Sequence, residues 1–146
     1  MGNDISSISD AAASGNNAEI KKLVEAGGNV NEVDCDKQFK HLAIGLTPLM
    51  CAARQGHDSS IRLLVELGAK VGMKGDEGKT ALCIAAVNEN VSCIRVLHEL
   101  GGDVEDADDR GRTCLHWAAV HGKDKSTRVL VELGANVERK DNVMSK

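Results

Sequence analysis

The sequence predicts an all-α solenoid of four stacked helix-turn-helix units joined by polar, glycine-containing turns. Residues 113–122 read TCLHWAAVHG, and related stretches begin 33 and 66 residues earlier, at Thr80 and Thr47. Apolar and glycine positions downstream keep the same register, ending at Leu-Gly pairs. The 146 residues hold four such units and one insertion. A fixed period of this length indicates supersecondary units that bury their apolar faces against one another.

The first unit, residues 6–30, is a degenerate copy that we interpret as an N-terminal cap. Ile8, Ile20 and Val30 keep the apolar columns of the later units. A terminal repeat has one face without a neighbour, and that face is expected to be polar. Polar residues stand where inner units are apolar or neutral, at Ser6, Ser7, Ser9, Asp10 and Lys22.

Residues 31–46 form a long insertion loop, since the interval from Val30 to Thr47 holds eight more residues than the same interval later. It contains the only phenylalanine, Phe39. The loop is either a tolerated insertion, because closure entropy rises slowly with length, or a finger that contacts a partner, because insertions in repeats often lie on one binding face. Both interpretations remain open.

Units two, three and four span residues 47–71, 80–104 and 113–137. A threonine opens each as a helix N-cap, and Pro48 suits the first helical position. Gly56 and Gly122 are expected to turn the chain into a second helix, which carries an inward apolar stripe. Glu89 replaces this glycine in unit three: either it takes a left-handed conformation, which costs roughly 1–2 kcal/mol, or Asn90 beside it shifts the turn. Glycines expected just beyond the second helices are Gly68, Gly101 and Gly134.

These residues resemble ankyrin repeats, whose pattern is TPLHxAAxxGHxxxVxxLLxxGAxVN with a DxxGxTPL hairpin. The resemblance covers residues 6–142, and residues 138–146 match the start of a next hairpin. It implies antiparallel helix pairs with projecting hairpins in a curved stack, whose members bind proteins through the hairpin tips and the first helices on the concave side. It also implies structural roles for His57 and for His116, the latter as a hydrogen-bonding residue between adjacent loops.

The resemblance implies a non-catalytic protein–protein interaction module or scaffold with no cofactor. The alternative is a targeting or regulatory segment of a longer enzyme or signalling protein, which a reading frame continuing past Lys146 would favour. By analogy, equivalent positions on the tips and first helices, together with Phe39 of the insertion, are the expected partner-binding residues. They are Arg54, Gln55, Asp76, Glu77, Lys79, Val87, Asn88, Asp109, Arg110, Arg112, Val120, His121 and Phe39.

Composition argues against other classes. A net charge of −4 and a near absence of aromatic residues argue against nucleic-acid binding. Gly78-Lys79-Thr80 resembles the end of a phosphate-binding loop, but Met73 stands where the first glycine is required. The cysteines lack metal-site spacing, so no metal is expected. Trp117 is expected to pack in the core between units three and four.

Location follows from similar reasoning. Five cysteines, an odd number, are unlike a secreted disulfide framework and favour a reducing cytoplasmic or nuclear setting. We expect a monomer with an unidentified protein partner. No apolar run is long enough to span a membrane, so membrane association would depend on myristoylation of Gly2, for which MGNDIS fits the pattern.

Overall fold

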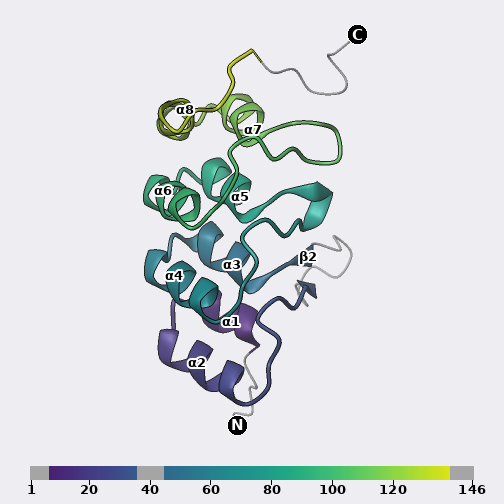
Figure 1. Ribbon diagram of the computed structural model, residues 1–146, viewed down its shortest axis with the longest axis vertical. Helices are drawn as coiled ribbons and strands as arrows, with labels where there is room; N and C mark the ends of the chain where they lie inside the picture. The colour runs from purple at the N-terminus through teal and green to yellow at the C-terminus, as the bar shows by residue number, and fades with distance from the viewer. Residues whose placement is uncertain (1–6, 36–44, 139–146) are drawn as a thin grey trace.

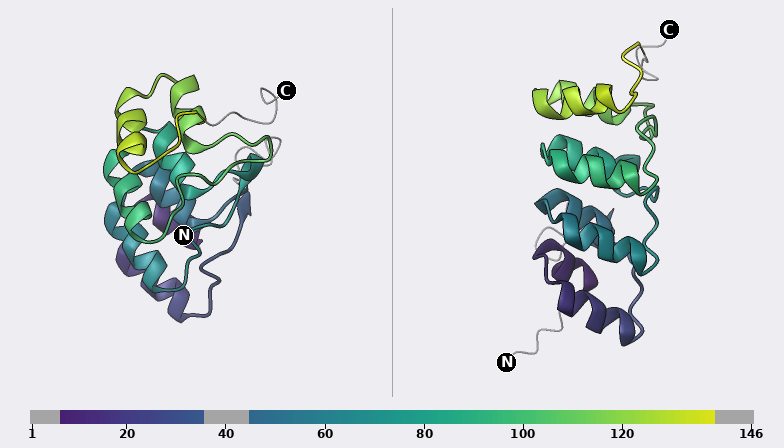
Figure 2. Two further views of the ribbon diagram at one scale, coloured as in Figure 1. Left: turned by 45° about the horizontal axis from the view of Figure 1, so that its top comes forward. Right: turned by 60° about the vertical axis from the view of Figure 1, so that its left-hand side comes forward.

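The structure is a stack of helix pairs, each layer lying on the one before it (Figures 1 and 2). This computed structural model describes residues 7–35 and 45–138, so Gly2 and Phe39 lie outside the described residues. First helices pack on first helices and second helices on second helices. The pairs are α1 (Ile8–Ala13) with α2 (Asn17–Glu25), α3 (Pro48–Gln55) with α4 (Asp58–Glu66), α5 (Ala81–Val87) with α6 (Val91–Glu99), and α7 (Cys114–Val120) with α8 (Asp124–Glu132).

Threonine opens each inner first helix, as predicted. The Thr47 hydroxyl accepts the N–H of Met50 at 3.3 Å, and the Thr80 hydroxyl accepts that of Cys83 at 3.4 Å. Thr113 is the N-cap of α7. These side chains satisfy amides that the first helical turn leaves without partners.

The turn between paired helices requires a left-handed residue. Gly56 and Gly122 have φ of +81° and +66° there, and Glu89 has +56° in the third layer. Glu89 itself takes the left-handed conformation, and the turn is not shifted to Asn90, whose φ is −86°. Its carboxylate accepts the N–H of Lys125 from the next layer at 3.2 Å, which partly offsets the strain.

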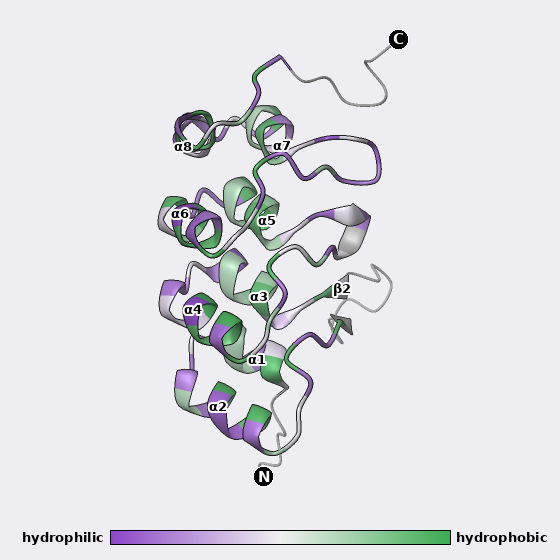
Figure 3. Cartoon of the chain, viewed as in Figure 1, coloured by the Kyte–Doolittle hydropathy of each residue, from purple (hydrophilic) through white to green (hydrophobic). Residues whose placement is uncertain are grey.

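The core runs the length of the stack, between the layers. The paired alanines of α3 and α5 are fully buried and let neighbouring helices approach closely. Ile61 and Ile94 of the second helices have no exposed surface. Figure 3 shows α3 and α5 as mostly hydrophobic, while the loop between α6 and α7 is mostly hydrophilic.

The first layer is polar on its outer side, with one exception. Asp10 and Lys22 are exposed, as predicted for a cap. Ser9, however, is only 4% exposed, and its hydroxyl has no hydrogen-bond partner among the described residues. The expectation of an outward polar group was wrong for Ser9, because it occupies the column of Met50 and Cys83, which is buried in the next two layers.

The insertion begins and ends as an antiparallel pair. Strand β1 (Asp34–Cys35) pairs with β2 (Gly45–Leu46), with Asp34 opposite Leu46 and Cys35 opposite Gly45. A 3-10 turn, η2 (Asp76–Gly78), lies in the loop between α4 and α5. None of the helices in the described ranges has the length and apolar character that a membrane span requires.

Candidate functional site

The loops before α5 and α7 project to the same side of the stack (Figure 1), and hydrogen bonds connect them. Across the gap, the N–H of Asp109 donates to the carbonyl of Glu77 at 3.2 Å. The Lys74 ammonium donates to the carbonyl of Ala107 at 2.7 Å. The two tips therefore form one continuous ridge rather than two independent loops.

Asp108 organises the second loop. Its side chain has no exposed surface. One carboxylate oxygen accepts the N–H groups of Arg110 at 2.9 Å and Arg112 at 2.8 Å. The other accepts Arg112 Nε at 3.0 Å and Trp117 Nε1 at 2.8 Å. Burial alone would raise the pKa of Asp108, but the backbone hydrogen bonds, the indole and the guanidinium together lower it, so the carboxylate is charged at neutral pH.

Trp117 lies against this carboxylate and under two cations. Its side chain is in the core, with only 9% of the residue exposed. The Lys79 ammonium lies 4.0 Å from its ring centroid, and the Arg112 guanidinium carbon lies 4.2 Å from it. The prediction of burial is confirmed, but the surroundings are not purely apolar. The indole joins units three and four partly through cation–π contacts.

The end of α7 adjoins the same cluster. The ring of His121 meets the ring of Trp117 edge-on, with centroids 5.8 Å apart and planes at 70°. His121 itself is exposed. The exposed end of a first helix is therefore adjacent to the base of the loops, in one connected surface.

The expected partner-binding residues divide by exposure. Lys79, Val87 and Arg112 are only half exposed, because Lys79 and Arg112 cover the indole and Val87 packs against the core. Asp76 lies in η2, and its side chain, like Phe39, is outside the described residues. The exposed members, which we call the inner surface, are Arg54, Gln55, Glu77, Asn88, Asp109, Arg110, Val120 and His121.

Sequence reasoning left Asp108 out of the candidate set. Its place in the DxxGxT hairpin pattern marked it as a loop residue, but nothing in the pattern indicated that it would also bind an indole nine positions later. Two of its four donors are loop amides and two are side chains. It supports the surface from beneath and is not itself part of the exposed set.

The two motif histidines have structural contacts. His57 Nε2 lies 3.0 Å from the carbonyl of Ala13, which links units two and one. His116 Nδ1 accepts the N–H of Thr113 at 3.0 Å. This bond lies within its own loop; the expected hydrogen bond from His116 to an adjacent loop stays a prediction, because the loop that follows lies outside the described residues. The ring nitrogen faces the helix start three residues earlier, where it completes a capping box.

The described thiols are placed for packing. Cys83, Cys93 and Cys114 are buried. The hydrogen bond with Cys83 and burial raise the pKa of Cys114, and burial with the adjacent Asp58 raises the pKa of Cys93, so both stay protonated at neutral pH. Within residues 7–35 and 45–138, no three His, Cys, Asp or Glu side chains converge as a metal ion would require.

Comparison with known proteins identifies one similarity. A family model described as ankyrin repeats, in three copies, matches residues 6–75 and 67–141. The match extends over nearly the whole chain and includes the loops, Asp108 and Trp117. A search of curated proteins finds no match to the chain.

Proposed function

Because this chain belongs to the ankyrin-repeat family, we propose that it is a non-catalytic module that binds a partner protein through its inner surface. Ankyrin repeats are generally protein–protein interaction modules. The observation that carries the proposal is that equivalent exposed positions of successive layers form one inner surface. Hydrogen bonds hold its two loop tips together as a ridge.

The repeat period aligns the exposed side chains. Gln55, Asn88 and His121 stand 33 residues apart at the C-terminal ends of three successive first helices, Asn88 and His121 as the C-caps, and all three are exposed. A partner that follows the stack would meet one side chain from each layer. Such a surface offers many similar contacts in a row, as other solenoids do.

The ridge is also preorganised. The backbone bond from Asp109 to Glu77, together with the Lys74 contact, fixes the loops relative to each other. Asp108 and Trp117 then tie the second loop to α7. Less conformational entropy is lost when a partner binds loops that are already ordered, so more of the contact energy appears as affinity.

Charge suggests which partner surface would fit. The segment 103–112 carries five acidic residues and two arginines. Because Asp108 and Arg112 neutralise each other internally, the remaining charge of this segment is acidic, opposed by Arg110 and by the Lys74 ammonium of the neighbouring loop. A partner with a basic patch facing this loop would gain mainly in association rate.

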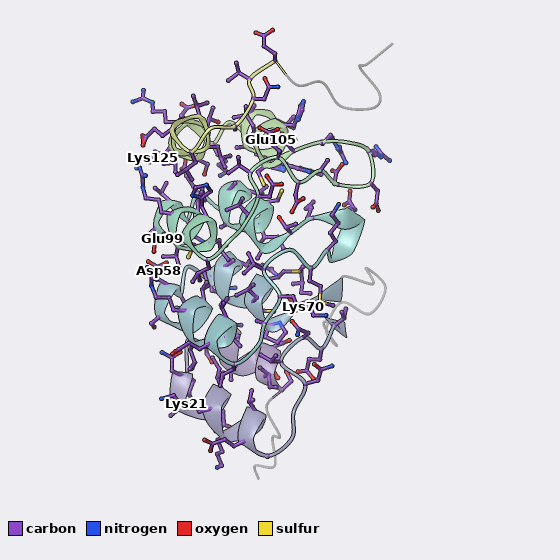
Figure 4. All side chains as sticks on the ribbon, in the orientation of Figure 1. Lys21, Asp58, Lys70, Glu99, Glu105 and Lys125 are labelled. Carbon is purple, nitrogen blue, oxygen red and sulfur yellow. The ribbon has the colours of Figure 1, made fainter. Side chains whose placement is uncertain are left out.

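The experiment compares two variants that carry the same changes in charge. The test variant has Arg54→Glu, Arg110→Glu and Val120→Lys on the inner surface. The control has Lys21→Glu, Ser92→Lys and Lys125→Glu on the second helices; Lys21 and Lys125 lie on the side away from the loops (Figure 4). All six residues are exposed, so both variants should unfold at the wild-type temperature.

Each variant is used as bait in lysate from the native cell, and bound proteins are quantified by mass spectrometry. We expect one protein that wild type and control retain and the test variant loses. Equal capture by all three baits, or selective loss with the control, would reject the inner surface as the binding site.

A further inference from the structure

The last described layer has an apolar groove on its far side. Val131 and Val137 are 44% and 63% exposed, and they are two of the four exposed large hydrophobic residues in residues 7–35 and 45–138. They help to line a hollow of about 320 Å³ on α7, α8 and the segment after them. We call it the terminal groove; its lining residues are Leu115, His116, Ala119, Thr127, Val131 and Val137.

Most of these columns are buried in the preceding layer, although His98, in the column of Val131, stays half exposed there. Leu82, Ala86, Ile94 and Val104 are 1%, 0%, 0% and 6% exposed. They stand 33 residues before Leu115, Ala119, Thr127 and Val137 respectively. Since α7 packs on α5 and α8 on α6, the following layer is what covers these columns. The structure therefore shows, within itself, what kind of surface fits the terminal groove.

Arg128, beside the groove, belongs to a column of arginines that pair with a glutamate of the following layer. Arg62 of α4 bonds Glu99 of α6 at 3.1 Å, and Arg95 of α6 bonds Glu132 of α8 at 3.0 Å. Arg128 continues this arginine column on α8. It is exposed and has no ion-pair partner among the described residues. A following layer would place a carboxylate there.

The loop at the edge of the groove offers a further contact. Between units three and four, the Glu105 carboxylate accepts the N–H of Asn136 from the next layer at 2.6 Å. Glu138 occupies the same column one period later and is exposed. The apolar groove, Arg128 and the Glu138 carboxylate thus lie one repeat after the groups that bind the next layer inside the stack.

We propose that the terminal groove binds a partner protein through an antiparallel helix pair of the same repeat design. The partner carries apolar side chains in the columns of Ile84 and Val96 and a carboxylate in the column of Glu99, which pairs with Arg128. This surface is separate from the inner surface, so both can be occupied together.

A second copy of this chain does not meet these requirements. In its first layer, Asp10 stands in the column of Ile84 and Lys22 in the column of Val96, and both are exposed. Docking would bury the Lys22 ammonium against the apolar groove, which is strongly unfavourable. Only Glu25, in the column of Glu99, already suits Arg128.

This mismatch provides a probe. The probe is the full chain with Asp10→Ile and Lys22→Val, which give its first layer inner-type residues, and Val131→Lys, which blocks its own groove and prevents open-ended assembly. Circular dichroism first establishes that it is folded. If Asp10→Ile prevents folding, a probe with only Lys22→Val and Val131→Lys replaces it. Sedimentation velocity then follows its mixture with the wild-type chain.

We expect a one-to-one complex that wild type alone does not form. Arg128→Glu in the wild-type chain should weaken it by about fivefold or more, the effect of losing a surface ion pair and gaining a like-charge contact. Glu25→Arg in the probe should restore the affinity for the Arg128→Glu chain. This charge exchange tests the register as well as binding.

Three results would overturn the proposal. One is the absence of a complex at several hundred micromolar of each chain. The second is wild-type self-association as strong as probe binding, which would assign the groove to a second copy. The third is probe binding only to a chain shortened after Glu138, which would assign the groove to residues 139–146.

Discussion

Asp108→Asn tests whether the buried carboxylate holds the loop ridge together. Asparagine has nearly the same shape and keeps one oxygen for the N–H groups of Arg110 and Arg112. Its amide nitrogen, however, would face Arg112 Nε and Trp117 Nε1, which are both donors. The substitution thus removes two charge-assisted hydrogen bonds and places donors against donors.

The expected cost follows from these two contacts. A buried donor that loses its acceptor costs about 1–3 kcal/mol. Arg112 is near the lower end, because 22% of its side chain is exposed and water can replace the carboxylate. The Trp117 indole is buried and has no such replacement. We therefore expect Asp108→Asn to lower the free energy of unfolding by about 2–4 kcal/mol.

Urea unfolding provides the assay. Trp117 is the only tryptophan, so its fluorescence reports directly on this cluster. Asp109→Asn is the matched control, since Asp109 is exposed and its side chain does not bind the indole. Surface substitutions usually change the free energy of unfolding by no more than about 0.5 kcal/mol. If Asp108→Asn and the control unfold with free energies within that range of each other, the Asp108 carboxylate does not hold the ridge together.

The difference in free energy of unfolding between wild type and Asp108→Asn should depend on pH. The pKa of Asp108 is lowered in the folded protein relative to an unfolded aspartate, about 3.9. The charged carboxylate therefore contributes stability that is fully present above pH 4 and is lost as pH falls through the lower folded pKa. The stability difference between wild type and Asp108→Asn should be constant from pH 5 to 7 and should shrink below pH 4. A difference unchanged down to pH 3 would contradict the assigned role.

Three further predictions concern the contacts between layers, each measured by urea unfolding. Glu89→Gly should raise the free energy of unfolding by up to about 1 kcal/mol, because relief of the left-handed strain exceeds the flexibility of glycine; a clear loss would show that the bond to Lys125 dominates. Ser126→Ala should cost about 1–2 kcal/mol, since its fully buried hydroxyl donates to the carbonyl of Ala86 at 2.7 Å, and a neutral effect would mean that this bond contributes little. Gly78→Ala should cost at least about 1–2 kcal/mol, because Gly78 has φ of +80° and an added Cβ would lie 2.8 Å from the Asp109 backbone nitrogen; an unchanged midpoint would show that the tips can separate freely.

The repeat made the fold predictable. Threonine caps, left-handed turn residues and buried alanine pairs are local features, so each recurs wherever its short motif recurs. The column left open whether Glu89 or a turn shifted by Asn90 would replace the glycine; the structure gives Glu89 the left-handed geometry of Gly56 and Gly122. Equivalent positions in the repeats of this one chain therefore suffice to predict the helices and turns.

The Trp117 cluster was less predictable because its partners come from different repeats. Lys79 precedes Trp117 by 38 positions and reaches the indole only after two layers have stacked. The column of Trp117 contains Cys51 and Ile84, which suggested simple apolar packing. No local pattern encodes a cation over a ring. Ser9 is a different case, because its column, that of Met50 and Cys83, is buried in the next two layers and indicates burial in spite of its polar side chain.

Hydrogen–deuterium exchange on the chain bound to its captured partner tests the central claim most directly. Amide exchange is compared between free and bound chain at peptide resolution. Binding at the inner surface should slow exchange in the segments 76–80 and 109–112 and at the C-terminal ends of α3, α5 and α7, with α4 and α6 unchanged. Protection confined to the second helices, with no change in either loop, would contradict the assignment of the inner surface.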